Sequence, residues 1–336
     1  MKLGTIVFIT VFFFSLKSNA ALAPQALTKI AIGYATISGA SAVLWTAQDE
    51  KLLAKNGIEA DLVFMPGSPT LIAAINSGSL AVGYTGGTAT LGAAAGGVDF
   101  KILEASHGRV MHDLVVKSEI KEPKDLRGKR IGVTSIGGTG WMAGMLAFEQ
   151  LGLNPDKDKL IVSGFGDMRI VSQALESGTI DGGLVSGNYT AQFRRLGFGT
   201  LGELERIPLL GSSVVVKQSF VQSQPELLRN FIKALVEAHA FVLSPIKKQS
   251  VLRILTKRLN ITDPSVAEDT LQDLWRRMDK KPYPSLEGLR NIQRFMQARN
   301  PKVGQVKLQE LIDDSIMREL DKSGYIDRIY AEYGVK

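Results

Sequence analysis

The chain has 336 residues, of which 45% are hydrophobic, and this length is enough for two globular domains with large cores. The formal net charge of +7 comes from basic residues scattered among acidic ones, a distribution that argues against a nucleic-acid-binding protein. No cysteine occurs in these 336 residues, which excludes disulfides, thiolate catalysis, cysteine-based metal sites and a lipidated N-terminal cysteine within them.

The first residues predict a secretory signal peptide. Lys2 precedes an apolar run over 3–16, and the small-residue sequence Ser18-Asn19-Ala20-Ala21 follows it. A membrane-spanning helix is the alternative, but the run is shorter than the about 20 apolar residues that cross a bilayer. We therefore expect residues 1–20 to be removed on export, which leaves a net charge of about +5 because Lys2 and Lys17 leave with them.

Three strand–helix units are predicted in the first part of the exported chain. The strands are expected at 28–34, 58–65 and 80–84, and the helices at 42–55, at 70–77 and from 88 to the glycines at 96–97. Ser38 or Ser41 is the expected N-cap of the first helix. Ser68 is expected to cap the second, with Pro69 in its first turn.

A second set of three units repeats the first. Its strands are expected at 130–133, 159–162 and 180–185, and its helices at 141–150, at 168–177 behind an N-cap at Asp167, and at 189–196. The sequence INSGSL at 75–80 matches LESGTI at 175–180, and residues 115–117 match 215–217, both at an offset of 100 positions. This repeat predicts an α/β fold of two similar doubly wound lobes, each with a largely parallel sheet covered on both faces.

The chain is expected to cross between the lobes through two hinge strands, at 114–117 and 214–217. Lobe 1 would then comprise residues 21–114 and 217–336, and lobe 2 residues 115–216. From Gln224 onward the sequence predicts a helical extension of lobe 1, with amphipathic helices at 226–243, 251–259, 265–278, 286–298 and 308–325.

The expected ligand site is a cleft between the lobes, because ligands of open α/β sheets bind beyond the carboxyl ends of the strands. Six loops, three from each lobe, would face this cleft with hydroxyls, backbone N–H groups and helix N-termini. The candidate ligand-binding residues are Tyr34, Thr36, Ser38, Gly39, Ser41, Gly67, Ser68, Tyr84, Thr85, Gly86, Thr88, Ser135, Gly137, Gly138, Thr139, Trp141, Gly166, Asp167, Ser186 and Asn188.

These loops predict binding rather than catalysis. They contain no histidine and no pair of carboxylates, so a nucleophilic hydroxyl would lack a base. The glycines at 137–140 do not have the spacing of a dinucleotide fingerprint, and no phosphate-binding loop is present, so no cofactor is expected. For Trp141, stacking on a ligand and packing in the core both remain open.

Three residues near the first hinge strand carry competing interpretations. His107 and His112 are five positions apart with Gly108 between them, which favours structural histidines over metal ligands, and no metal is expected. Arg109 could clamp a carboxylate or sulfonate, or serve a structural role, and the sequence leaves both open. Arg169, just after the cap at Asp167, is expected to pair locally on the helix surface.

The chain resembles the periplasmic substrate-binding proteins of ABC importers, in the nitrate, sulfonate and taurine branch. The resemblance is carried by DLRGKRIGV at 125–133, ALESGTID at 174–181, GFGTL at 197–201 and the helix that begins at Pro225. It implies the type II binding-protein fold, a solute held in the interlobe cleft by hinge closure, and delivery to a membrane permease. It further implies a monomeric periplasmic protein that uses no cofactor.

The ligands of that family are too varied to transfer. Because the six loops contain no lysine or arginine except Arg169, the residues favour a small organic ligand held by N–H groups and hydroxyls. One alternative is an enzyme on the same scaffold. The fungal thiamine-pyrimidine synthases carry a cysteine-rich motif that is absent here, and the related menaquinone-pathway enzymes are cytoplasmic. The other alternative is a sensory ligand-binding module.

Overall fold

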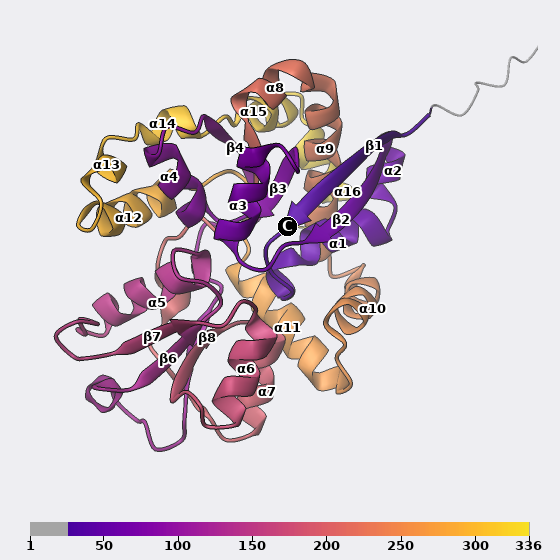
Figure 1. The fold of residues 1–336 in the computed structure, drawn as a ribbon. Coiled ribbons are helices and arrows are strands. Elements are labelled where there is room, and N and C mark those ends of the chain that lie inside the picture. Colours follow the sequence, from indigo (N-terminus) through magenta and orange to yellow (C-terminus); the bar gives the residue numbers. More distant parts are fainter. Residues whose placement is uncertain (1–25, 336) are drawn as a thin grey trace, which may run out of the picture.

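Residues 26–335, the part of the chain that this computed structural model describes, form two lobes, each built around a five-stranded sheet (Figure 1). The predicted signal peptide at 1–20 lies outside these residues. Across 26–335, no helix is both long and apolar enough to cross a membrane.

The sheet of lobe 1 contains four parallel strands and one antiparallel strand. Its strands, in spatial order, are β2 (Ile58–Phe64), β1 (Thr28–Tyr34), β3 (Val82–Thr85), β10 (Ser213–Lys217) and β4 (Phe100–Ala105). The strand β10 runs antiparallel to both of its neighbours, β3 and β4. The helices of this lobe are η1 (Gly39–Ser41), α1 (Ala42–Asp49), α2 (Leu52–Lys55), α3 (Ser68–Ser77) and α4 (Gly87–Ala95).

The sheet of lobe 2 has the same arrangement. Its strands, in spatial order, are β7 (Ile161–Gly164), β6 (Arg130–Val133), β8 (Gly182–Val185), β5 (Asp113–Val116) and β9 (Gly199–Leu201). Here β5 is the antiparallel strand, paired with β8 and β9. The helices are η2 (Pro123–Leu126), α5 (Thr139–Gln150), α6 (Met168–Glu176), α7 (Asn188–Arg195) and η3 (Leu204–Arg206).

The shared strand order confirms the two similar, largely parallel lobes that the repeat predicts. The matching residues 115–117 and 215–217 lie in or directly after the antiparallel strands β5 and β10. Gly78 and Gly178, also 100 positions apart, both follow a helix with a positive φ, of 82° and 78°, which favours glycine. The strands β4 and β9 complete the two sheets, although the sequence did not predict them.

The chain changes lobes earlier than the sequence predicts. All of β10 belongs to the sheet of lobe 1, and all of β5 belongs to that of lobe 2. The links are therefore residues 106–112, the first crossing, and 202–212, the second crossing. The crossings pair with each other, since the Ser106 N–H donates to Ser212 O (2.9 Å) and the Leu209 N–H to Gly108 O (2.9 Å). The hinge is thus a short antiparallel ribbon.

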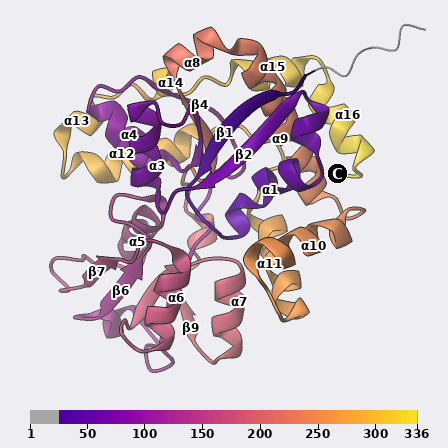
Figure 2. The same ribbon diagram turned by 45° about the vertical axis from the view of Figure 1, so that its right-hand side comes forward.

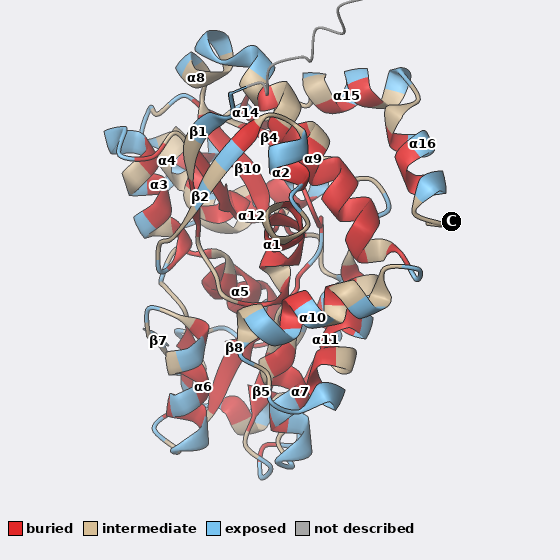
Figure 3. Ribbon diagram, turned by 90° about the vertical axis from the view of Figure 1, so that its right-hand side faces the viewer, coloured by how far each residue is buried: buried red, intermediate tan, exposed pale blue. Residues whose placement is uncertain are grey.

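Residues 218–335 form the C-terminal extension, which is helical as predicted. Its helices are α8 (Gln218–Ser223), α9 (Pro225–Leu243), α10 (Lys248–Leu259), α11 (Pro264–Arg277), α12 (Leu286–Gln297), α13 (Pro301–Gly304), α14 (Leu308–Leu311), α15 (Ser315–Lys322) and α16 (Tyr325–Glu332). The helix α9 is buried over most of its length against the first lobe (Figure 3).

One predicted helix of the extension, at 308–325, is broken into α14, α15 and α16. The break has a physical cause at the edge of the first sheet. Ile312 forms an isolated parallel bridge with Ile102 of β4, and the Asp313 N–H donates to Ile102 O (2.9 Å). Extended backbone at this point covers the edge strand, which would otherwise expose unpaired N–H and C=O groups.

The C-terminal extension also touches lobe 2, on both sides of the hinge (Figures 1 and 2). On one side, Arg195 of α7 donates to Asp269 of α11 at 2.8 Å. On the other, Arg294 of α12 makes two hydrogen bonds, of 2.8 and 2.7 Å, to the carboxylate of Glu149 on α5. The extension is therefore attached to lobe 1 and makes contacts with lobe 2 on both flanks.

Candidate functional site

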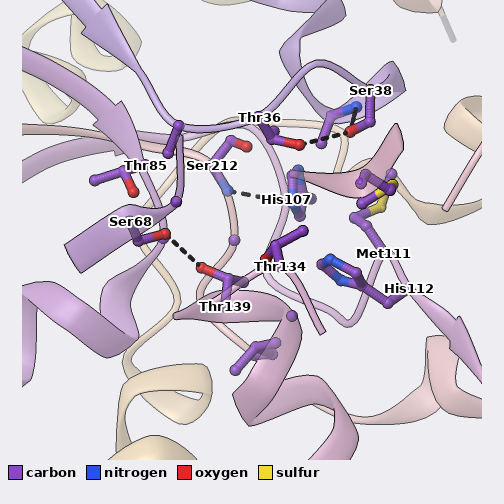
Figure 4. Close-up of a pocket in the computed structure, with 18 of the residues that line it drawn as sticks. Thr36, Ser38, Ser68, Thr85, His107, Met111, His112, Thr134, Thr139 and Ser212 are labelled. Carbon is purple, nitrogen blue, oxygen red and sulfur yellow. Dashed lines mark hydrogen bonds between the residues drawn. The ribbon is translucent and has the colours of Figure 1, made fainter. Parts of the chain in front are cut away.

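Four helix N-termini surround one small cavity between the lobes. The helices η1, α3 and α4 start directly after strands of lobe 1, and α5 starts after β6 of lobe 2. The cavity has a volume of about 40 Å³. It is lined by Ala35, Thr36, Ser38, Ala40, Gly67, Ser68, Tyr84, Thr85, Gly86, His107, Arg109, Met111, His112, Thr134, Thr139, Gly140, Met168, Leu209, Gly211 and Ser212 (Figure 4).

The wall from lobe 1 supplies hydroxyl groups. Ser38 is the N-cap of η1 and accepts from the Ala40 N–H at 3.3 Å, while Thr36 Oγ1 donates to Ser38 Oγ at 3.4 Å. Thr85 Oγ1 is buried and has no hydrogen-bond partner within residues 26–335. Since buried hydroxyls are nearly always paired, Thr85 is a candidate partner for a ligand.

The two lobes meet at the rim of the cavity. Ser68 Oγ, at the start of α3, lies 3.3 Å from Thr139 Oγ1 at the start of α5. Figure 4 shows these two side chains pointing toward each other from opposite lobes. The N-cap of α3 is Gly67, with φ of 79°, so the prediction of Ser68 as the cap is wrong by one residue. By contrast, the N-cap at Asp167 is confirmed, because its carboxylate accepts from the Ile170 N–H at 3.0 Å.

The third wall is the hinge itself. The first crossing contributes His107, Arg109, Met111 and His112, and the second crossing contributes Leu209, Gly211 and Ser212. His107 Nε2 accepts from the Ser212 N–H at 3.2 Å, which places the imidazole proton on Nδ1. A ligand in the cavity would therefore touch both lobes and the ribbon that joins them.

Both cavity histidines are uncharged at neutral pH. Burial lowers the pKa of His107 to about 3, and His112, His239 and Arg277 act in the same direction. Burial also lowers the pKa of His112 to about 4, against the opposing effect of Asp113. Among the described residues that line the cavity, Arg109 is the one with a permanent charge, and its side chain is exposed. The lining thus offers neutral donors and acceptors and one peripheral cation.

Residues of the C-terminal extension form hydrogen bonds with the first crossing. The Gly108 N–H donates to Asp279 Oδ2 at 2.6 Å. Arg277, whose side chain is 5% exposed, donates to Val110 O at 3.3 Å and to Asp113 Oδ1 at 2.7 Å. Its Nε–H donates to Asp273 Oδ1 on the same helix at 2.7 Å. The position of the cavity wall therefore depends on residues far along the chain.

The cavity includes part of the residue set predicted from the sequence. Eight of those residues line it: Thr36, Ser38, Gly67, Ser68, Tyr84, Thr85, Gly86 and Thr139. The others do not: Tyr34, Gly39, Ser41, Thr88, Ser135, Gly137, Gly138, Trp141, Gly166, Asp167, Ser186 and Asn188.

Several of the residues outside the lining have a structural position that accounts for them. Tyr34 packs in the core against Trp45 and Phe64, with ring centroids 6.3 and 5.5 Å away. Ser41 Oγ is turned back to donate to Thr36 O at 2.7 Å. The loop at 186–188 is covered by η1 and α11, because a Cβ at Gly187 would lie 3.3 Å from the Thr270 side chain.

The hinge wall of the cavity lies outside the predicted set, in which the binding role of Arg109 was left open. The signal for it was present in the two histidines and the arginine around Gly108, next to a predicted crossing. Thr134, Gly140 and Met168 were missed as well, each beside a residue that had been predicted.

The chain is similar to several known proteins in sequence or in fold. The taurine-binding periplasmic protein of Escherichia coli (strain K12) is 27% identical over 198 residues, which cover 57% of this chain and 60% of that protein. The alkanesulfonate-binding protein of Xanthomonas axonopodis pv. citri, solved with bound MOPS, has a TM-score of 0.71 at 19% identity over 86% of this chain and 99% of its own. A desulfurization enzyme has a TM-score of 0.59 at 16% identity over 88% and 99% of the two chains.

The fold is that of the periplasmic binding proteins, which confirms the fold class expected from the sequence. The alignment with the taurine-binding protein spans less than two thirds of that relative's length. The model of the family described as NMT1/THI5 like matches residues 39–245, more than half of the chain, and the chain belongs to this family.

Proposed function

We propose that this protein is an extracytoplasmic solute-binding protein that captures a small ligand in the interlobe cavity by hinge closure and delivers it to an ABC permease. The observation that carries the proposal is a cavity whose walls come from both lobes and from the hinge ribbon. A ligand that touches both lobes interacts more strongly with the closed state, so its binding shifts the population toward closure.

The chemistry of the lining favours binding over catalysis. Within the described part of the chain, no carboxylate lines the cavity. The pKa values of its two histidines, about 3 and about 4, lie far below the pH at which a general base works best. The enzyme alternative has the fold of the desulfurization enzyme in its favour, and turnover of a bound compound would support it.

The electrostatics favour a small ligand with an oxyanionic group. The starts of η1, α3, α4 and α5 direct backbone N–H groups and positive dipole ends toward the cavity. Arg109 adds a cation at the periphery, and the hydroxyls of Thr85 and Thr139 add donors. Taurine and alkanesulfonates, which give two similar proteins their names, have such a group.

A thermal-stability screen with taurine, short alkanesulfonates, nitrate and carboxylates tests the proposal on the purified chain without its first 20 residues. A ligand at one hundred times its Kd should raise the free energy of unfolding by about 2.7 kcal/mol. Thr85→Val should weaken binding of the active compound by roughly ten- to a hundredfold, since the ligand would lose a hydrogen bond in a buried site.

Thr46→Val is the matched control for Thr85→Val. Thr46 is also buried with an Oγ1 that lacks a partner within the described residues, but it lies in α1 and does not line the cavity. We expect its affinity to equal that of the wild type. Stabilisation by no compound in the screen, or equal losses in the two variants, would contradict the proposed site.

Trp141 should report closure without contacting the ligand. Its ring lies edge-on to Phe295 of the C-terminal extension, with centroids 6.1 Å apart, and the Arg299 guanidinium lies 6.0 Å from the Trp141 ring centroid. We expect Trp141→Phe to change affinity less than about threefold while removing most of the ligand-induced fluorescence change. A large loss of affinity measured by calorimetry would instead place the indole in the binding site.

A further inference from the structure

The glycine-rich loops of the two lobes meet each other more closely than side chains would allow. We define the closure seam as Gly67, Ser68 and Gly86 of lobe 1 with Ser135, Gly138 and Thr139 of lobe 2. A Cβ built on Gly67 would lie 2.7 Å from Ser135 Oγ. A Cβ on Gly86 would overlap Thr139 Oγ1 and lie 3.1 Å from both Thr139 Cβ and Cγ2. At this seam there is no room between the lobes for an added methyl group.

At Gly86 the requirement for glycine is steric, because the backbone conformation there suits any residue. Its φ of −89° and ψ of 164° are values that any residue adopts, so the backbone does not require glycine there. Gly67 is different, because its φ of 79° independently favours glycine. The three atoms nearest to a Cβ at residue 86 all belong to the Thr139 side chain of the opposite lobe. Glycine is therefore required at 86 by the approach of Thr139 and not by the backbone conformation.

Lobe 2 also approaches lobe 1 near Gly187. A Cβ on Gly187 would lie 3.7 Å from Gly39 N of lobe 1, an ordinary contact, and 3.3 Å from Thr270 of the extension. The approach between the lobes that a Cβ would block is therefore the closure seam rather than this one.

We propose that Gly86 is the steric determinant of closure: its missing side chain lets α4 and α5 come together over the cavity, and any side chain there holds the cleft open. Gly86 then acts by clearance for Thr139 rather than by contact with a ligand. This inference rests on the proposed function in one respect, which is that capture of a ligand requires the two lobes to close. It also gives the glycines of the repeated loops a role in addition to exposing N–H groups.

Disulfide trapping tests the proposal without a ligand. The chain has no cysteine, so Ser68→Cys with Thr139→Cys introduces a single thiol pair where the two native oxygens lie 3.3 Å apart. Under a mild oxidant the pair should cross-link at a rate proportional to the closed population. Adding Gly86→Ala should slow cross-linking by about tenfold to a hundredfold, because the added methyl group overpacks the seam.

Gly92→Ala is the matched control. Gly92 lies on the same helix, α4, and its Cβ would meet only Met296 Cε at 3.5 Å, an ordinary contact. This variant should cross-link at the rate of the parent pair. Equal rates for Gly86→Ala and Gly92→Ala would overturn the proposal, as would a parent pair that does not cross-link at all.

A double-mutant cycle adds a binding readout, with taurine and ethanesulfonate as probes. Gly86→Ala should lose about tenfold or more in affinity in the wild-type background, and close to nothing in a Thr139→Gly background, where the obstructing atoms are gone. Losses of the same size in both backgrounds would show that Gly86 acts through the ligand, against the proposal. Binding of neither probe to the wild type would count against the proposed ligand class, while the cross-linking result would still decide the role of the seam.

Discussion

Glu104 should lower the free energy of unfolding by about 2 kcal/mol between pH 6.5 and pH 9, and Glu104→Gln should abolish this contribution. Glu104 lies in β4 and is fully buried. Burial raises the pKa of Glu104 to about 8, against the opposing effect of a hydrogen bond from Ser106. One carboxylate oxygen accepts from Ser106 Oγ at 3.3 Å, and the other has no partner within residues 26–335.

The sign follows from proton binding. With a folded pKa near 8 and an unfolded value near 4.5, the folded chain binds a proton more tightly, so this stability is lost as the pH rises through 8. The histidines act at lower pH. Burial lowers the pKa of His107, His112 and His239, so the unfolded chain binds more protons below pH 6.5 and stability falls there too. Stability should therefore be highest near pH 6.5.

Urea unfolding at a series of pH values measures this profile. Glu237→Gln is the control, because Glu237 is also buried but has Lys55 Nζ at 2.7 Å from one oxygen. That variant should keep the fall above pH 6.5. If the free energy of unfolding of Glu104→Gln fell above pH 6.5 as much as that of the wild type, another group would be titrating. The assignment to Glu104 would then be wrong.

Replacing Arg277 by methionine should destabilise the chain by about 3–5 kcal/mol. The guanidinium is 5% exposed and links three groups: Asp273 on its own helix, and Val110 O and Asp113 at the hinge. Its loss would leave two largely buried carboxylates without their shared cation. Arg277→Lys keeps the charge but not the planar fork, so we expect it to recover only part of the loss.

Arg294→Met is the matched control for Arg277→Met. Arg294 also joins the C-terminal extension to lobe 2 through a two-pronged contact with Glu149, but both side chains are about half exposed, at 51% and 49%. An exposed pair of this kind contributes only about 0–1 kcal/mol. Chemical unfolding should separate the two variants clearly, and similar losses would show that burial does not govern the strength of these links.

The fold could be predicted largely because its signals are local. Each lobe repeats short apolar strands, glycine stops and caps such as Asp167, and these are visible within a few residues of sequence. The strand β4 escaped prediction because Lys101 and Glu104 interrupt its apolar pattern, although Glu104 is buried. The strand β9 has three residues, too few for a periodic signal.

The cavity could be predicted only in part because its third wall is built by non-local contacts. The loops after β1, β2, β3 and β6 contribute as strand ends should. His107 reaches the cavity because the first crossing pairs with residues about 100 positions later, such as Ser212. The loop after β8 contributes no lining residue, since η1 and α11 cover residue 187. Neither arrangement has a signature in a short stretch of sequence.

The place of β10 between β3 and β4 has a consequence for how the chain acquires its structure. Lobe 2 draws its sheet from one uninterrupted stretch, from β5 to β9, so it can be completed as soon as that stretch has been made. The first sheet must wait for Ser213–Lys217 to fill a gap between strands synthesised more than a hundred residues earlier. As the chain emerges N-terminus first, the later lobe is therefore the one whose sheet can be completed first, and the earlier one is left with two open edges that need protection from aggregation.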